Sequence, residues 1–248
     1  MMNLFIFTPM RYFCLCIGIL AFFSCKKQPK TEDENKIDML EVHTSDSTLE
    51  KKLIRAGLVN IQSVIPEIQV ELKYSTTDNF LHADVYGDLT NAYLQKDVVE
   101  KLKAAYQFLQ ETHPNLTFII YDAVRPLSIQ YKMWEILDLP PGQKEKYLSN
   151  PKNGSIHNYG AAIDMSLAEK NGNPLDMGTP FDFFGEAAEP QLEYKMLQEG
   201  VLTQQQIDNR KILRSVMQKA GFRQLPAEWW HYNSCSREKA KVLYKVIQ

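Results

Sequence analysis

Two short stretches of the sequence carry residue types that bind metals and move protons. One stretch is SIHNYGAAIDMSL, which holds His157 and Asp164 seven positions apart. The other is EWWHY, which holds Glu228 and His231 three positions apart. A catalytic zinc ion usually takes three protein ligands from His, Asp and Glu and keeps a fourth position for water. Two imidazoles and one carboxylate would complete such a set, and the remaining carboxylate could act as a base beside it.

Each stretch also has an ordinary structural interpretation. A histidine in a Gly-Ser loop is common, and Gly160 followed by two alanines is typical of a tight turn into a buried strand. EWWHY could be an aromatic core strand with a hydrogen-bonded histidine. Side chains alternate between the two faces of a strand, so Glu228 and His231 share a face only if the chain bends near Trp229–Trp230. Either stretch alone therefore favours the structural interpretation.

The remaining histidines need no metal. His43 lies in a charged and polar segment, and His82 in the stretch NFLHADVYG is expected in a loop. His113 precedes Pro114 at the end of a predicted helix, where a cation suits the helix dipole. The two stretches above therefore hold the histidines with the best claim to a metal.

The order of several further motifs makes these two stretches much more specific. The chain contains, in this order, YDAVRP, the pattern SxHxxGxAxD, DMGTPFDFF, NRKILRSVMQKAGF and EWWHY. This set resembles the zinc D-alanyl-D-alanine dipeptidases, the VanX-like family of metallopeptidases. The resemblance extends from about residue 57 to the C-terminus.

The resemblance implies one Zn²⁺ ion held by His157, Asp164 and His231. It also implies that Glu228 is the general base and that Arg125 assists at the scissile carbonyl. Two neutral imidazoles and one carboxylate leave net positive charge at the ion, which lowers the pKa of a water molecule there. A glutamate can carry that proton to the leaving amine, and an arginine stabilises a developing oxyanion. Because this ligand set is not strongly selective for zinc, the residues do not exclude another divalent metal in its place.

Three positions keep an alternative role. Arg125 could form a structural salt bridge with Asp122. Asp176 and Asp182 are either loop caps or, as the resemblance implies, a binding site for the free amine of the substrate. The chain also departs from the family at residues 183–190, FFGEAAEP, where relatives tend to carry a Ser-His pair. A strict preference for D-Ala-D-Ala therefore does not follow from the motifs.

Three functions are consistent with these residues. The leading hypothesis is hydrolysis of D-Ala-D-Ala or similar D,D-dipeptides. A second is a D,D-carboxypeptidase or endopeptidase that acts on peptidoglycan stem peptides. A third is a catalytically silent lipoprotein that binds wall peptides, but Glu228 argues against it, because a pure binding protein needs no base beside its metal.

Hydrophobic periodicity predicts the elements that must position these residues. Helical and strand patterns are mixed along the chain, which indicates a single α+β domain with a small, mainly antiparallel sheet flanked by helices. Helices are expected over residues 96–113, 126–137, 203–221 and 236–247, and strands over residues 68–74, 116–123, 160–168 and 228–234.

The N-terminus has the pattern of a targeting segment. Residues 1–24 carry one basic residue, Arg11, and the apolar run YFCLCIGILAFFS ends directly before Cys25. This run suits a signal peptide and resembles a bacterial lipoprotein signal, with Cys25 lipidated. Residues 25–50 are mostly charged and polar and are expected to form a flexible tether to a catalytic domain over residues 51–248. The predicted location is the cell envelope, as a lipid-anchored protein facing the periplasm, with secretion to the periplasm as the alternative.

Composition excludes one class of partner. The 28 basic residues nearly balance the 30 acidic residues of the 248-residue chain, so no strong electrostatic field favours nucleic acid. Cys14 and Cys16 would be removed with the signal, and Cys25 would be acylated. Cys235 then remains alone in the folded part and is expected as a buried thiol without a disulfide partner.

Overall fold

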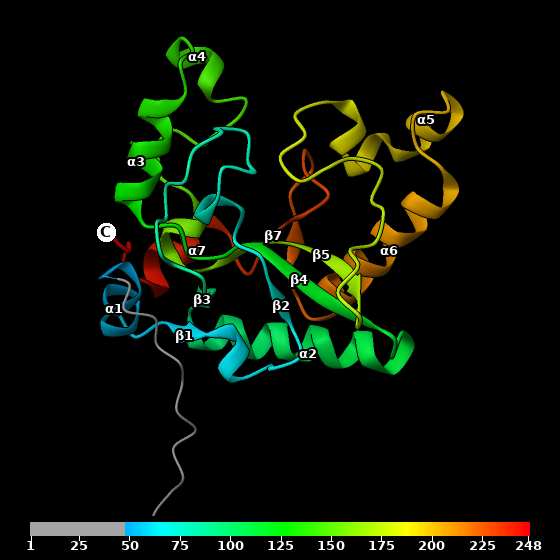
Figure 1. Ribbon diagram of the computed structural model, residues 1–248, viewed down its shortest axis with the longest axis horizontal. Coiled ribbons are helices and arrows are strands. Elements are labelled where there is room, and N and C mark those ends of the chain that lie inside the picture. The colour runs from blue at the N-terminus through cyan, green and yellow to red at the C-terminus, as the bar shows by residue number, and fades with distance from the viewer. Residues whose placement is uncertain (1–47) are drawn as a thin grey trace, which may run out of the picture. The chain divides into compact units, whose positions relative to one another are not determined.

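A five-stranded sheet lies at the centre of the domain (Figure 1). The computed structural model describes residues 48–248. The strands run in the order β2-β4-β5-β7-β6, with β2 parallel to β4 and the other three pairings antiparallel. The predicted α+β fold with a mainly antiparallel sheet is therefore confirmed. The strand bounds are β2 (Gln69–Val70), β4 (Leu116–Asp122), β5 (Ala162–Glu169), β6 (Arg223–Gln224) and β7 (His231–Asn233), and a separate pair comprises β1 (Val59–Asn60) and β3 (Tyr93–Leu94).

The main core lies between one face of this sheet and helix α2 (Lys96–Thr112), which runs along one side of the sheet (Figure 1). The apolar residues of α2 recur with the helical period, and all of them on that stripe are buried. Alternate residues of β5 enter the same core, namely Ile163, Met165 and Leu167. Full burial of one such side chain contributes about 1.5–3 kcal/mol. The intervening residues of β5, among them Asp164, point to the other face, which is therefore open to a functional site.

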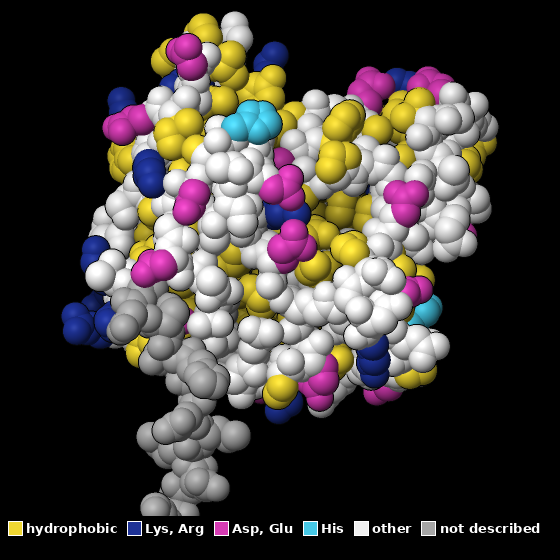
Figure 2. Space-filling model, viewed as in Figure 1, with side chains coloured by type: hydrophobic (Ala, Val, Ile, Leu, Met, Phe, Trp, Pro, Cys, Tyr) yellow, Lys and Arg dark blue, Asp and Glu magenta, His cyan; other side chains and the backbone are white. Residues whose placement is uncertain are grey.

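The remaining helices flank the sheet and extend beyond it. Helix α3 and the short helix α4 stand at one side in Figure 1, whereas α5 and α6 stand at the other. The molecular surface is hollowed between these two groups (Figure 2). The bounds are α1 (Thr48–Arg55), α3 (Leu127–Ile136), α4 (Pro141–Lys144), α5 (Glu193–Gln198), α6 (Gln204–Lys219) and α7 (Arg237–Leu243).

Four predicted boundaries differ from the structure by three residues or more. Helix α1 begins at Thr48, before the predicted domain start at residue 51, because buried Glu50 accepts hydrogen bonds of 2.6 Å from Tyr93 and from Asn91. The strand predicted over 68–74 is shorter, because after Val70 the chain leaves the sheet edge and forms a single 3₁₀ turn. The other two differences lie near the C-terminus, where the strand is confined to His231–Asn233 and the last helix ends at Leu243.

Other predictions agree with the structure within the described residues. Cys235 is a buried free thiol, His113 caps the end of α2, and His82 is an exposed loop residue. The signal peptide at residues 1–24, the lipidated Cys25 and most of the tether lie outside the described residues, so they stay predictions. Within residues 48–248, no helix combines the length and the apolar character needed to cross a membrane.

Candidate active site

The register of the sheet brings three polar residues into one row. Asp164 of β5 pairs directly with His231 of β7 and, on its other side, with Asp122 of β4. A register irregularity between Ile120 and Asp122 places Asp122 opposite Asp164. Side chains of directly paired residues lie about 4.5–5.5 Å apart at their Cβ atoms. Residues that are far apart in the sequence therefore converge on the open face of the sheet.

His157 reaches this row from a single 3₁₀ turn, Ile156–Tyr159, that precedes β5. Ser155 caps the turn: its hydroxyl accepts the backbone N–H of His157, and its own N–H donates to Asn158. Gly160 ends the turn with φ 63°, in the left-handed region that favours glycine. The predicted tight turn into a buried strand is confirmed, and it delivers His157 beside Asp164.

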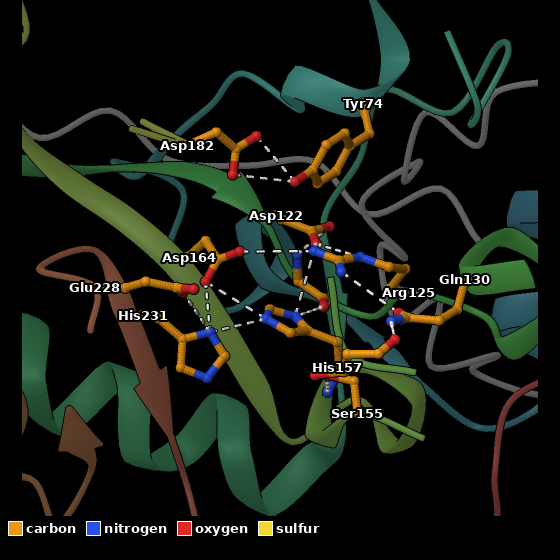
Figure 3. Close-up of polar contacts among 12 residues, drawn as sticks. Tyr74, Asp122, Arg125, Gln130, Ser155, His157, Asp164, Asp182, Glu228 and His231 are labelled. Carbon is orange, nitrogen blue, oxygen red and sulfur yellow. Dashed lines mark hydrogen bonds and ion pairs between the residues drawn. The ribbon is translucent and has the colours of Figure 1, made fainter. Parts of the chain in front are cut away.

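The donor atoms of the three predicted metal ligands lie close together (Figure 3). Oδ1 of Asp164 is 2.8 Å from Nδ1 of His231 and 3.4 Å from Nε2 of His157, and the two imidazole nitrogens are 3.2 Å apart. A tetrahedral zinc ion with ligands at 2.0–2.1 Å holds them about 3.3 Å apart. Within residues 48–248 these three form the one cluster of His, Cys, Asp or Glu side chains with such geometry. The buried cluster therefore fits a single zinc ion.

The second nitrogen of each imidazole has its own hydrogen-bond partner. Nδ1 of His157 donates to the carbonyl of Ala123 at 2.6 Å, and Nε2 of His231 donates to Oδ1 of Asn233 at 3.0 Å. These contacts fix the ring orientations and leave Nε2 of His157 and Nδ1 of His231 as the atoms that can face a metal ion. Asn233 was not predicted from the sequence. Its position two residues after His231 on a strand, and therefore on the same face, was the available signal.

The charges of the cluster also suit a cation. Burial alone would raise the pKa of Asp164, but the imidazoles of His157 and His231 outweigh burial and hold it below its usual value. Burial alone would lower the pKa of His231, but Asp164 and Glu228 raise it to about 9. His231 therefore holds a proton at neutral pH in the metal-free protein. A bound metal ion would take the place of that positive charge.

Glu228 lies beside the cluster, as predicted. Its Oε2 atom is 3.8 Å from Nδ1 of His231. The chain bends at Trp229 and Trp230 before β7 begins, which is the bend that the spacing of EWWHY required. Burial raises the pKa of Glu228 above its usual value. A carboxylate with a raised pKa next to the metal position is suited to general base catalysis.

Arg125 combines the two roles that were left open. Its guanidinium donates from Nε and Nη2 to Oδ2 of Asp122, at 3.0 and 2.5 Å, so the structural salt bridge exists. Nη2 also lies 3.8 Å from Oδ2 of Asp164, and the side chain lines the same cavity as the ligands. Asp122 therefore holds the guanidinium in place at the metal position.

The structure distinguishes the two aspartates that were candidates for substrate binding. Asp182 lines the cavity, has φ 60°, and accepts hydrogen bonds of 3.0 and 3.2 Å from the hydroxyl of Tyr74 (Figure 3). Burial, with a further contribution from Asp164, raises the pKa of Asp182 well above its usual value. Asp176 is exposed, lies outside this cavity and accepts from the backbone N–H of Gly178. The substrate-binding role thus fits Asp182, and Asp176 is the loop cap that was its alternative.

The cavity that contains these groups is small, at about 190 Å³. Sites for drug-sized ligands usually measure about 300–1,000 Å³. Phe184, from the segment that departs from the family, lines this cavity and packs against Tyr147 and Phe80 at ring-centroid distances of 4.8 and 5.1 Å. Residues 183–190, where the chain departs from the family, therefore contribute an aromatic wall to the cavity and no residue to the metal cluster.

The fold and the buried cluster of His157, Asp164 and His231, with Glu228 and Arg125 beside it, fit a zinc metallopeptidase. More narrowly, the chain belongs to the Peptidase_M15 family, described as D-ala-D-ala dipeptidase, whose model matches residues 54–247. The predicted resemblance is therefore confirmed.

Individual relatives agree with this family. The D-alanyl-D-alanine dipeptidase of Escherichia coli (strain K12) is 31% identical over 71% of this chain and 83% of its own length. The protein of the same name from Synechocystis sp. is 28% identical over 56% of this chain and 68% of its own length. A solved structure, VanYB in complex with D-Alanine-D-Alanine, aligns over 62% of this chain and 77% of its own, with 15% identity and a TM-score of 0.32.

Proposed function

We propose that this zinc metallopeptidase hydrolyses the peptide bond of D-Ala-D-Ala or of similar small D,D-dipeptides. The observation that carries the proposal is the convergence of His157, Asp164, His231 and Glu228 in one small cavity that also contains Asp182. The names of the relatives, which are D-alanyl-D-alanine dipeptidases, support the same substrate.

The residues divide the chemistry among themselves. His157, Asp164 and His231 would hold the ion, which supplies polarisation of the scissile carbonyl and a lowered pKa of water. Glu228 takes a proton from the attacking water and passes it to the nitrogen of the leaving amino acid. Arg125 keeps its positive charge and stabilises the negative charge that develops on the carbonyl oxygen. Because Asp122 holds Arg125 before the substrate arrives, this stabilisation costs little reorganisation.

Asp182 supports a free dipeptide over a longer peptide. Burial raises the pKa of Asp182, and the ammonium group of a dipeptide would counter this effect, because a nearby positive charge favours the ionised carboxylate. In a stem peptide the corresponding nitrogen is part of an amide and carries no charge, so Asp182 would be left without an ionic partner. A site built around such a polar contact rejects ligands that lack the matching group.

The location is a separate proposal that rests on residues 1–27. The apolar run before Cys25 and the lysines after it support a lipid anchor at Cys25 and an envelope protein facing the periplasm. There the enzyme would act on free dipeptides or on wall fragments, because it could not reach the cytoplasmic pool. A Cys25→Ser variant should move from the membrane to the soluble fraction on cell fractionation. Membrane association of that variant at the wild-type level would contradict lipidation.

The activity can be tested with the full-length protein loaded with zinc and offered D-Ala-D-Ala, L-Ala-L-Ala and a pentapeptide stem. The proposal expects release of D-alanine from D-Ala-D-Ala and little cleavage of the other two. Cleavage of the stem but not of the dipeptide would favour the carboxypeptidase alternative. Tight peptide binding without any turnover would favour the silent binding protein.

A Glu228→Gln variant tests the assigned base. It keeps the size of the side chain but cannot take a proton, so turnover should fall by about 10²–10⁴-fold. Zinc content, measured by atomic absorption, should stay at the wild-type level because Glu228 is not a ligand. Wild-type turnover in this variant would show that another group is the base.

A further inference from the structure

Arg237 is a second cation in the cavity wall, and its neighbour Glu238 interacts with it electrostatically without forming an ion pair. Arg125, the other arginine there, is paired with Asp122. Arg237 donates from Nη1 to the backbone carbonyl of Asn153 at 3.1 Å, and no carboxylate within residues 48–248 forms an ion pair with it. A guanidinium carries five N–H donors and stays charged at any physiological pH. Most of the donors of Arg237 are therefore available to a ligand.

The contact with Asn153 places Arg237 at the Ser155 end of the cavity. Asn153 lies two residues before Ser155 in the loop that leads to His157. Ser155 is only 7% exposed and lines the same cavity. Its hydroxyl accepts the N–H of His157 but donates to no acceptor among residues 48–248. This end of the cavity thus offers a cation and an unused hydroxyl donor.

The opposite end of the cavity carries an acidic side chain. In Figure 3, Asp182 with Tyr74 lies on one side of the three metal ligands and Ser155 lies on the other. A dipeptide has an ammonium group at one end, a carboxylate at the other and the scissile bond between them. The order of Asp182, the metal ligands and Arg237 matches this order of charges.

We propose that Arg237 binds the C-terminal carboxylate of the substrate, with the Ser155 hydroxyl as a second donor. This inference rests on the proposed function, because it assumes that Asp182 faces the ammonium group. The planar fork of a guanidinium matches the two oxygens of a carboxylate, and such charge-assisted pairs are among the stronger hydrogen bonds in proteins. The enzyme then requires a free C-terminal carboxylate and is an exopeptidase, which distinguishes it from an endopeptidase.

The test combines enzyme variants with substrate variants. The full-length, zinc-loaded wild type and Arg237→Ala are compared on D-Ala-D-Ala and on D-alanyl-D-alaninamide, which lacks the carboxylate. Removing the guanidinium should raise KM for D-Ala-D-Ala by about 10- to 100-fold, the range for loss of a hydrogen bond to a charged group, and leave kcat nearly unchanged. For the amide, KM should be high with the wild type and no higher with the variant.

Two further variants complete the experiment. Arg237→Lys keeps the charge but not the fork, so its KM for D-Ala-D-Ala should lie between those of the wild type and Arg237→Ala. Lys239→Ala removes a charge from an exposed position of the same helix and should behave as the wild type.

Two results would overturn the inference while the proposed function stands. One is an unchanged KM for D-Ala-D-Ala in Arg237→Ala at wild-type zinc content. The other is an equal loss of activity on the dipeptide and on the amide. Wild-type protein that hydrolyses neither substrate would instead overturn the proposed function, and this inference with it.

Discussion

Replacement of Asn233 by alanine should weaken zinc binding without removing any ligand. The Nε2–H of His231 donates to Oδ1 of Asn233 at 3.0 Å, and this contact leaves Nδ1 of His231 as the atom that binds the ion. An alanine leaves the ring without this acceptor, so its orientation and its tautomer are no longer fixed. The backbone pairing of Asn233 within β7 is unaffected by the change.

The size of the effect follows from the contact that is lost. Loss of the hydrogen-bond partner of a metal-binding histidine typically costs 10- to 100-fold in metal affinity. Each tenfold corresponds to about 1.4 kcal/mol, and an ordinary hydrogen bond contributes about 0.5–1.5 kcal/mol. Asn233 is half-buried and lines the cavity, so water can partly replace the lost acceptor. The lower end of the range, about tenfold, is therefore expected.

Competition with a chromophoric zinc chelator at fixed pH measures the dissociation constant directly. Asn233→Asp keeps an oxygen acceptor for His231 and should bind zinc at least as tightly as the wild type. Asn171→Ala, at an exposed position away from the cavity, should leave the affinity unchanged. At saturating zinc, the kcat of Asn233→Ala should approach that of the wild type.

One result would refute this reasoning. If Asn233→Ala binds zinc as tightly as the wild type, the hydrogen bond to His231 does not organise the site. An equal loss of affinity in Asn233→Asp would lead to the same conclusion, because that variant keeps the acceptor.

Three further predictions concern the metal, the turn and the cavity. The pKa of His231 is about 9 in the metal-free protein, so zinc competes with a proton for this residue. The zinc affinity measured by chelator titration should therefore rise by about tenfold per pH unit below pH 9. A flat profile between pH 6 and 8 would contradict this. Gly160→Ala puts a Cβ atom on a backbone with φ 63° and 3.0 Å from the Leu58 side chain. The free energy of unfolding, measured in urea, should therefore fall by about 1–2 kcal/mol. The control Gly142→Ala has open space for its Cβ atom and should be nearly neutral. Burial raises the pKa of Asp182 in the folded, metal-free protein, whereas the unfolded chain ionises at the usual carboxylate pKa. The free energy of unfolding therefore falls as pH rises above that usual pKa. Asp182→Asn should therefore raise the melting temperature at neutral pH and weaken binding of D-Ala-D-Ala, and a lower melting temperature would count against the assigned cause.

Much of the site could be predicted from the sequence, because its residues sit in short motifs. His157 and Asp164 share one turn-strand segment, and Glu228 and His231 share another. Each segment alone favoured a structural interpretation, and the ligand set followed from the order of the motifs, which resembles that of the VanX-like family. The bend at Trp229–Trp230 followed from the alternation of side chains along a strand. The central helices and strands were predicted within about two residues, because their buried faces repeat with the period of the element.

The sequence by itself thus indicated the candidate ligands and the candidate base, through the resemblance of its ordered motifs, and it predicted the elements that carry them, because local periodicity depends on neighbours along the chain. Only the tertiary structure decided which strands pair and in which register, and so placed Asp122, Asp164 and His231 in one row. It also showed that the left-handed backbone at Asp182 brings this carboxylate into the cavity while Asp176 caps an exposed loop. The cation Arg237 and the acceptor Asn233 likewise entered the site through the fold. These features arise from contacts between segments distant in sequence, whose geometry no local periodicity encodes.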